Sequence, residues 1–225
     1  MTASVPQPLP YFLMEQIRRG IITGRYGPGA ALREQKLEIE YGTSRGPLRE
    51  ALRLLELRGL VTHEPRRGFR VREYSAQMVE QIYRLRGLLE RHTVEALAGK
   101  PLEALIVKLT AANGKMAGHF ASKNIEAYLE ANVEFHEAIL HTADNEPLQR
   151  SIASLNEMAQ PIRYALLASQ FNRSRAIGEH EQIIMHISAG DLKRAAAAIE
   201  AHIIGNIDVV TRLYGEGAPG DPGGE

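Results

Sequence analysis

The spacing of apolar residues along the chain is mainly helical. Near the start, Phe12, Leu13, Ile17 and Ile21 recur with helical spacing, and further on Leu48, Leu52 and Leu55 form one stripe. Glycines stand where such helices would end, and turn residues separate the segments. The pattern therefore predicts three short helices, at about 12–24, 33–41 and 44–58.

Two short stretches after the third helix alternate apolar and polar residues. They cover residues 60–63 and 69–72, and between them lies the turn-forming segment EPRRG. This pattern predicts a β-hairpin. Three helices followed by a hairpin outline a winged helix-turn-helix domain, which we place at residues 7–74.

From Ser75 onward no segment has the pattern of a strand. Pro161 lies inside one predicted helix and is expected to kink or split it. The last residues, 214–225, are rich in glycine and proline, which is typical of a disordered tail. We therefore expect a mainly α protein in which an all-α bundle of about six helices, over 76–213, follows the winged helix. Its helices are predicted at about 76–98, 102–121, 123–143, 147–169, 174–189 and 192–213.

The composition excludes several classes of protein. Charged residues make up 24% of the chain and hydrophobic residues 44%, as in an ordinary globular protein. Cysteine is absent, which excludes disulfides, thiolate metal sites and a cysteine nucleophile. We find neither a secretory signal nor an apolar run long enough to span a membrane, so we expect a cytoplasmic protein with no membrane partner.

The formal net charge of zero conceals an uneven distribution. Residues 1–75 hold 13 basic and 8 acidic side chains, whereas the remaining 150 residues hold 14 basic and 19 acidic ones. A basic module joined to an acidic one indicates two domains with different partners, and nucleic acid is a candidate partner for the basic one.

The third predicted helix has the chemistry of a helix that reads DNA. Arginines at i, i+4 and i+8 share the face opposite the leucines, where a guanidinium group can grip guanine or clamp a phosphate. The helix start and the hairpin tip can add phosphate or minor-groove contacts. The alternative is a three-helix scaffold with solvated arginines. The predicted DNA-binding residues are Ser44, Arg45, Arg49, Arg53, Arg66, Arg67 and Gly68.

Residues 7–72 resemble the DNA-binding domain of the GntR family of bacterial transcription regulators. The resemblance rests on PGAAL at 28–32, SRGPLREAL at 44–52, LRGLV at 57–61 and PRRGFRV at 65–71. It implies that Arg45 and Arg49 are the arginines that contact bases and phosphates, and that Gly68 is the glycine of the wing. Gly46 stands where the family usually has a hydroxyl residue, and Gln35 stands near a slot that is basic in some members.

Four side chains on three predicted helices of the second module have the donor atoms of a metal site. Asn132 and His136 lie one turn apart, and His180 and His202 lie on two later helices. Three imidazoles and one amide oxygen can bind a divalent cation inside a helical bundle. The alternative is that these residues belong to a helix surface or form an internal polar pair.

Residues 76–213 resemble the FCD ligand-sensing domain of the FadR-type branch of the GntR family. The motifs are YRLRGLLE at 83–90, NVEFHEAIL at 132–140, EHEQII at 179–184 and AGDLKRAAAAIEAHI at 189–203. The resemblance implies a divalent transition metal, with zinc first and nickel, manganese or iron as alternatives. Its ligands would be Asn132, His136, His180 and His202, with Asn132 standing where many members have aspartate.

The same resemblance implies a small organic acid as effector. Arg86 would point into the cavity and bind the acid, unless it instead forms an internal salt bridge to Glu90. The expected function is a ligand-responsive transcription regulator of the repressor kind. It is expected to bind an inverted-repeat DNA operator as a homodimer and not to be an enzyme. The alternatives are a direct metal sensor and a metal-dependent enzyme with a DNA-binding head.

Overall fold

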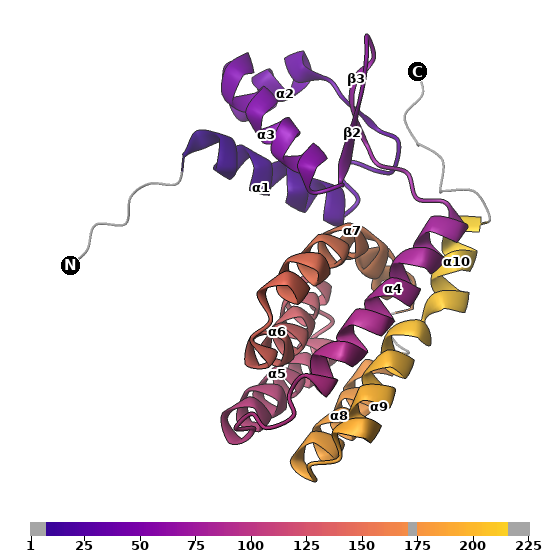
Figure 1. Cartoon of the computed structure of the whole chain (residues 1–225). Coiled ribbons are helices and arrows are strands. Elements are labelled where there is room, and N and C mark those ends of the chain that lie inside the picture. Colours follow the sequence, from indigo (N-terminus) through magenta and orange to yellow (C-terminus); the bar gives the residue numbers. More distant parts are fainter. Residues whose placement is uncertain (1–7, 171–174, 216–225) are drawn as a thin grey trace. The chain divides into compact units, whose positions relative to one another are not determined.

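The computed structural model describes residues 8–170 and 175–215 and divides into two compact units, with the boundary between Tyr74 and Ser75 (Figure 1). Each unit has its own apolar core. Both parts of the expected fold class are confirmed. The first unit contains three helices and a small sheet, and helices are the only regular secondary structure among the described residues of the second unit.

The first unit consists of α1 (Leu9–Ile22), β1 (Ala31–Leu32), α2 (Glu34–Tyr41), α3 (Arg45–Leu57), β2 (Val61–Glu64) and β3 (Gly68–Val71). The three helices begin and end close to the predicted positions. The leucine stripe of α3 is fully buried, because it packs against the apolar face of α1 inside a single core. Gly42 ends α2 in the left-handed conformation (φ 59°), which glycine adopts without strain.

The predicted hairpin is confirmed, with strand bounds displaced by one residue. β2 and β3 pair antiparallel in a register that places Glu64 opposite Gly68. β1 was not predicted; it pairs with β3 through Ala31 and Leu32, and the sheet order is β1-β3-β2. Two residues are too few to show an alternating pattern, so only the pairing with distant residues defines this strand.

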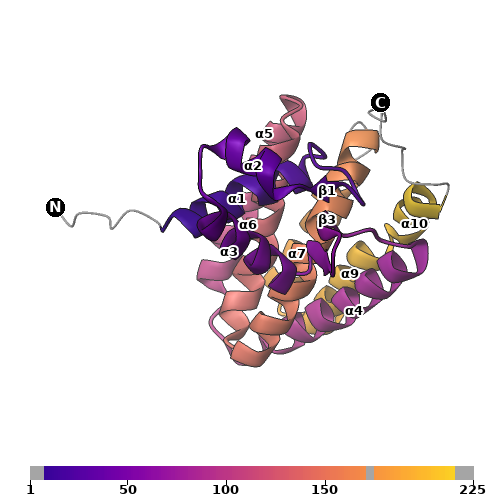
Figure 2. The ribbon, with the colours of Figure 1, turned by 90° about the horizontal axis from the view of Figure 1, so that it is seen from above.

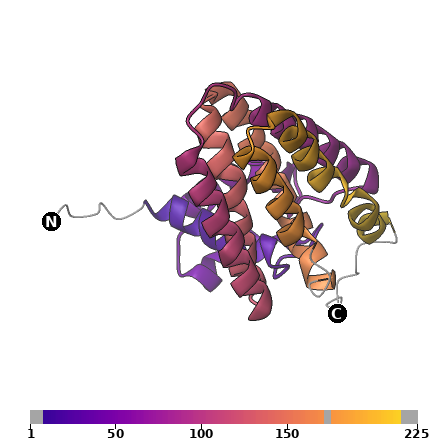
Figure 3. The ribbon, with the colours of Figure 1, turned by 90° about the horizontal axis from the view of Figure 1, so that it is seen from below.

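The second unit contains α4 (Ala76–Glu95), α5 (Glu103–Ala121), α6 (Ile125–Ala143), α7 (Glu146–Gln170), α8 (Ala176–Ser188), α9 (Leu192–Ile204) and α10 (Ile207–Gly215). The views in Figures 2 and 3 show α4 and α9 running side by side, in agreement with their extensive packing. The close approach is possible because Gly87 of α4 faces α9. A Cβ built at Gly87 would lie 2.9 Å from the Ile204 side chain of α9.

Three details of the helical prediction need correction. The last predicted helix, 192–213, is divided into α9 and α10 at Gly205, a poor helix former. α7 continues through Pro161, so the proline does not split it. Tyr214 and Gly215 belong to α10 rather than to the predicted tail, and residues 216–225 lie outside the described residues. Within the described ranges, no helix is both long and apolar enough to cross a membrane.

Candidate functional site

The predicted recognition helix presents its arginines on an exposed face. Ser44 is the N-cap residue of α3 and is exposed, although its side chain makes no capping hydrogen bond. Arg45 and Arg53 are exposed and Arg49 is half-exposed, on the side away from the buried leucines. The structure therefore brings the four predicted residues of this helix together on one accessible surface.

Glu34 on α2 holds two of these arginines. Its carboxylate accepts a hydrogen bond from Nε of Arg45 at 2.5 Å and lies 3.7 Å from Nε of Arg49. Sequence reasoning missed Glu34, because eleven residues of chain separate it from Arg45 and no helical spacing relates the two. The contact leaves the terminal nitrogens of both guanidinium groups as the atoms that can face a ligand.

The hairpin tip carries the other predicted DNA-binding residues. Arg66 and Arg67 are exposed, and Arg67 lies 3.6 Å from Glu64. Both Arg66 (φ 67°) and Gly68 (φ 80°) adopt positive φ. With Pro65 before it and a backbone hydrogen bond from Arg67 N to Glu64 O, Arg66 occupies the place of a tight turn that glycine usually takes.

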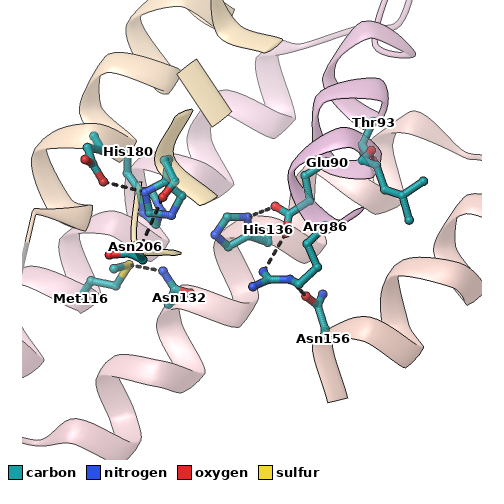
Figure 4. A network of polar contacts seen from close by, with 12 residues as sticks. Arg86, Glu90, Thr93, Met116, Asn132, His136, Asn156, His180 and Asn206 are labelled. Carbon is teal, nitrogen blue, oxygen red and sulfur yellow. Dashed lines mark hydrogen bonds and ion pairs between the residues drawn. The ribbon is translucent and has the colours of Figure 1, made fainter. Parts of the chain in front are cut away.

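The second unit contains a partly open cavity of about 320 Å³ beside the predicted metal ligands. His136 on α6, His180 on α8 and His202 on α9 are all buried, and one nitrogen of each lies within 4.8 Å of the others. Figure 4 shows His136 between Glu90 on one side and His180 on the other. His136 and His202 line the cavity, and His180 lies behind His202, with 3.3 Å between their Nε2 atoms.

Two carboxylates orient these imidazoles. Glu90 pairs with Nδ1 of His136, and Glu179 lies 2.8 Å from Nδ1 of His202. Burial alone would raise the pKa of Glu90, but the charges of His136 and Arg86 lower it to about 2. An ionised carboxylate accepts a hydrogen bond from Nδ1–H, which leaves Nε2 of His136 and of His202 as the nitrogen that can bind a metal ion.

The third imidazole lies in a different environment. His180 is fully buried and its ring stacks on Phe135, with 3.8 Å between the ring centroids. Burial, together with the neighbouring charges of His202 and His136, holds the pKa of His180 well below its usual value. A neutral imidazole is the form that binds a metal ion.

The residues present fit a divalent transition metal. Two nitrogen ligands at about 2.0–2.1 Å from a tetrahedral zinc ion lie roughly 3.3 Å apart. The Nε2 atoms of His180 and His202 have this separation, 3.3 Å. The fourth predicted ligand, Asn132, is buried one turn before His136 and lines the same cavity, with its amide nitrogen 3.9 Å from Sδ of Met116.

Arg86 lies in the cavity wall, but its guanidinium group is already engaged. Its Nη2 donates to Glu90 at 2.8 Å and its Nε donates to Asn156 at 2.9 Å (Figure 4). The internal ion pair that the sequence left open is thus formed. A second arginine of the cavity wall, Arg163 on α7, was missed by sequence reasoning, because it belongs to no motif quoted for the resemblance.

Both units match known families. Residues 12–71 match the bacterial regulatory proteins of the gntR family, and residues 81–205 match the FCD domain. The chain is 26% identical to YdhC, an HTH-type transcriptional regulator of Bacillus subtilis, over 94% of this chain and 96% of that protein. It is also 26% identical to the gluconate operon transcriptional repressor of Bacillus subtilis, over 78% of this chain and 74% of that protein.

A solved structure of McbR/YncC from E. coli has the same fold. It superposes with a TM-score of 0.79 at 21% identity, over 92% of this chain and 99% of that one. Together with the helix-turn-helix, the wing and the helical bundle described above, these matches identify the chain as a member of the GntR family of bacterial transcription regulators, with an FCD domain after its DNA-binding domain.

Proposed function

We propose that this transcription regulator is a repressor that binds an inverted-repeat operator as a homodimer, and that a small organic acid, held beside a divalent metal ion in the FCD domain, controls its affinity for DNA. The observation that carries the proposal is the cavity of about 320 Å³, with three histidines and three arginines in or beside its wall.

The proposed DNA contacts follow from the arginine surface of α3. Terminal guanidinium nitrogens can donate two hydrogen bonds to a guanine edge, while the exposed arginines of the hairpin tip can reach the phosphate backbone. One winged helix covers too few base pairs for useful discrimination. A two-fold dimer reads two half-sites, so an inverted repeat is the matching operator.

The proposed effector follows from the charge of the cavity. His136, His180, His202 and Asn132 would hold the metal ion, whose open coordination positions could accept a carboxylate. Arginine side chains suit the same group, because their planar donors match its two oxygens. The name of the relative from Bacillus subtilis, the gluconate operon repressor, points to the operon of a sugar acid and supports this effector class.

Control requires that the effector bind one arrangement of the protein better than another. Couplings between two sites are typically about 1–3 kcal/mol, which changes operator affinity by about 5–150-fold. An acid with equal affinity for both arrangements would bind without any effect on DNA affinity.

The test measures DNA affinity directly. Full-length protein is titrated into a fluorescent duplex from its own promoter region and into a scrambled duplex, with zinc present, and the anisotropy is recorded with and without a panel of small organic acids. We expect tight binding to the promoter duplex and at least a fivefold loss of affinity with one acid class. Equal binding to both duplexes under every condition would overturn the proposal.

Direct metal sensing is the second candidate. The three histidines already form a nearly complete ligand set within 4.8 Å, with no contribution from an organic ligand. In this case zinc, nickel or manganese alone would change the anisotropy titration, and the acids would have no effect at a fixed metal concentration.

A further inference from the structure

The wall of the cavity contains a cluster of polar groups that the metal site does not use. Tyr83 and Arg86 on α4 and Arg163 on α7 all line the cavity. The Arg86 guanidinium lies over the Tyr83 ring, 5.7 Å from its centroid. Burial raises the pKa of Tyr83, and the charges of Arg86 and Arg163 oppose that rise. We call Tyr83 and Arg163 the second polar pair of the cavity.

Arg163 differs from the other two arginines of the wall because both of those are held by ion pairs. Arg86 is bound by Glu90 and Asn156, and Arg175 contacts Glu179 at 3.5 Å and the carbonyl oxygen of Gly205 at 3.0 Å. No hydrogen bond or ion pair to Arg163 occurs among the described residues. Desolvation, followed by the like charge of Arg86, lowers the pKa of Arg163 to about 10.

Tyr83 contributes a buried hydroxyl group. Its side chain is 2% exposed, and its buried hydroxyl has no hydrogen-bond partner within the described part of the chain. A buried hydroxyl without a hydrogen-bond partner is unfavourable in the free protein, and so is a half-buried guanidinium group for which the described residues offer no ion-pair partner. In a native structure such groups mark the place of a ligand, an ion or an ordered water molecule.

The charges in and around the cavity indicate what kind of ligand this is. Three arginines line it, and the two glutamates that pair with them, Glu90 and Glu179, are also occupied by His136 and His202. One positive charge is therefore left over even before a metal ion binds. A ligand with a single carboxylate, bound at the metal ion, would leave this positive charge without a counter-charge and the Tyr83 hydroxyl without a hydrogen bond.

We propose that Arg163 and Tyr83 bind a second anionic group of the effector, so that the cavity selects small acids with two anionic groups over acids with one. The inference rests on the proposed function and narrows its effector class. Arg163 would hold the second group with two parallel hydrogen bonds, and Tyr83 would donate a third. A volume of about 320 Å³ suits a short dicarboxylate and is small for a ligand site.

The experiment compares acids that differ only in the second charge. Each dicarboxylate from malonate to adipate is paired with its half-amide, in which one carboxylate becomes a neutral carboxamide of nearly the same shape. Binding to zinc-loaded full-length protein is measured by calorimetry. We expect at least one dicarboxylate to bind ten times more tightly than its half-amide.

Substitutions then assign that preference to the second polar pair. Arg163→Gln should remove the preference and leave half-amide binding within twofold of wild type, whereas Tyr83→Phe should reduce the preference by about threefold. Arg150→Gln is the matched control, because Arg150 lies on the same helix with its side chain 80% exposed. Arg150→Gln should change neither the affinity for the dicarboxylate nor the affinity for its half-amide.

Stability separates this role from a structural one. Removing a desolvated cation that has no partner should leave the Tm of ligand-free Arg163→Gln equal to or above that of wild type. A lower Tm, or an equal loss of affinity for both members of a pair, would overturn the inference while the proposed function stands. Failure of every acid to bind either protein would overturn both.

Discussion

The Glu34 carboxylate on α2 accepts a hydrogen bond from Nε of Arg45 at the start of α3 and also lies 3.7 Å from Nε of Arg49. Glu34 is 15% exposed, whereas the side chain of Arg45 is 67% exposed. A largely buried anion thus positions two exposed cations. In this arrangement Glu34 restricts where the arginines point and also repels nearby phosphates.

The first prediction concerns this arrangement. Glu34→Gln should strengthen binding to a scrambled duplex several-fold, because a negative charge beside the DNA is lost, and should weaken discrimination between promoter and scrambled duplex. Anisotropy titrations at two salt concentrations measure both effects. The control is Glu56→Gln, which removes only the partner of Arg53. Unchanged discrimination in Glu34→Gln would show that the contact does not orient the arginines.

Arg49 provides the second prediction. Arg49→Ala should lower operator affinity by about 1–3 kcal/mol, the scale of one bidentate base contact, and abolish specific binding. Its helicity, measured by circular dichroism, should not change, since the side chain lies outside the core. Arg84→Ala removes an exposed arginine of the second unit and should bind the operator as wild type does. A wild-type titration curve for Arg49→Ala would refute the assignment of α3.

The hairpin tip allows stability and DNA binding to be separated. Arg66 has φ 67°, a conformation that costs about 1–2 kcal/mol for residues other than glycine. Glycine also has more conformational entropy in the unfolded chain, and this offsets part of the strain that the substitution relieves. Arg66→Gly should therefore stabilise the protein by about 0.5–1 kcal/mol. Arg66→Ala should not stabilise it. Both variants should lose DNA affinity to the same extent, because each lacks the Arg66 side chain. The slope of log affinity against log salt concentration should fall in both by the amount of about one phosphate contact.

Metal content and chelation test the histidine cluster. Protein purified without chelator should contain one equivalent of a transition metal by mass spectrometry, and chelation should lower its Tm because the metal binds only the folded state. His180→Gln should lose the metal and the response to chelator. His141→Gln, which alters an exposed histidine of α6, should retain both. If the wild type contained no metal and was not stabilised by zinc, nickel, manganese or iron, the metal proposal would be withdrawn.

The last prediction concerns the buried carboxylate. Glu90 binds Arg86 at 2.8 Å and also contacts His136, and all three side chains are buried. Glu90→Gln leaves the Arg86 charge uncompensated, so it should destabilise the second unit by about 3–5 kcal/mol in urea denaturation. Glu95→Gln, on the exposed part of the same helix, should change stability by less than about 0.5 kcal/mol. A comparable small effect for Glu90→Gln would mean that water or a rearranged partner replaces the carboxylate.

Features that depend on local spacing could be predicted from the amino-acid sequence. The leucine stripe and the arginine face of α3 follow from its helical period, and Gly42 marks the end of α2 because few other residues adopt its conformation. The quoted motifs were specific enough to indicate the family and to bring together His136, His180 and His202, whose proximity the structure then established.

Only the tertiary structure decided which distant side chains meet. Leu32 pairs with Phe69 in the sheet, Glu34 holds Arg45, and Glu179 orients His202, and in each case the partner lies on another element. Arg163 shows the reason most clearly. Its type and its position on a helix are ordinary, and its significance comes from its place in the cavity wall, where no other described residue forms an ion pair with it. Burial and pairing are properties of packing, which no local pattern encodes.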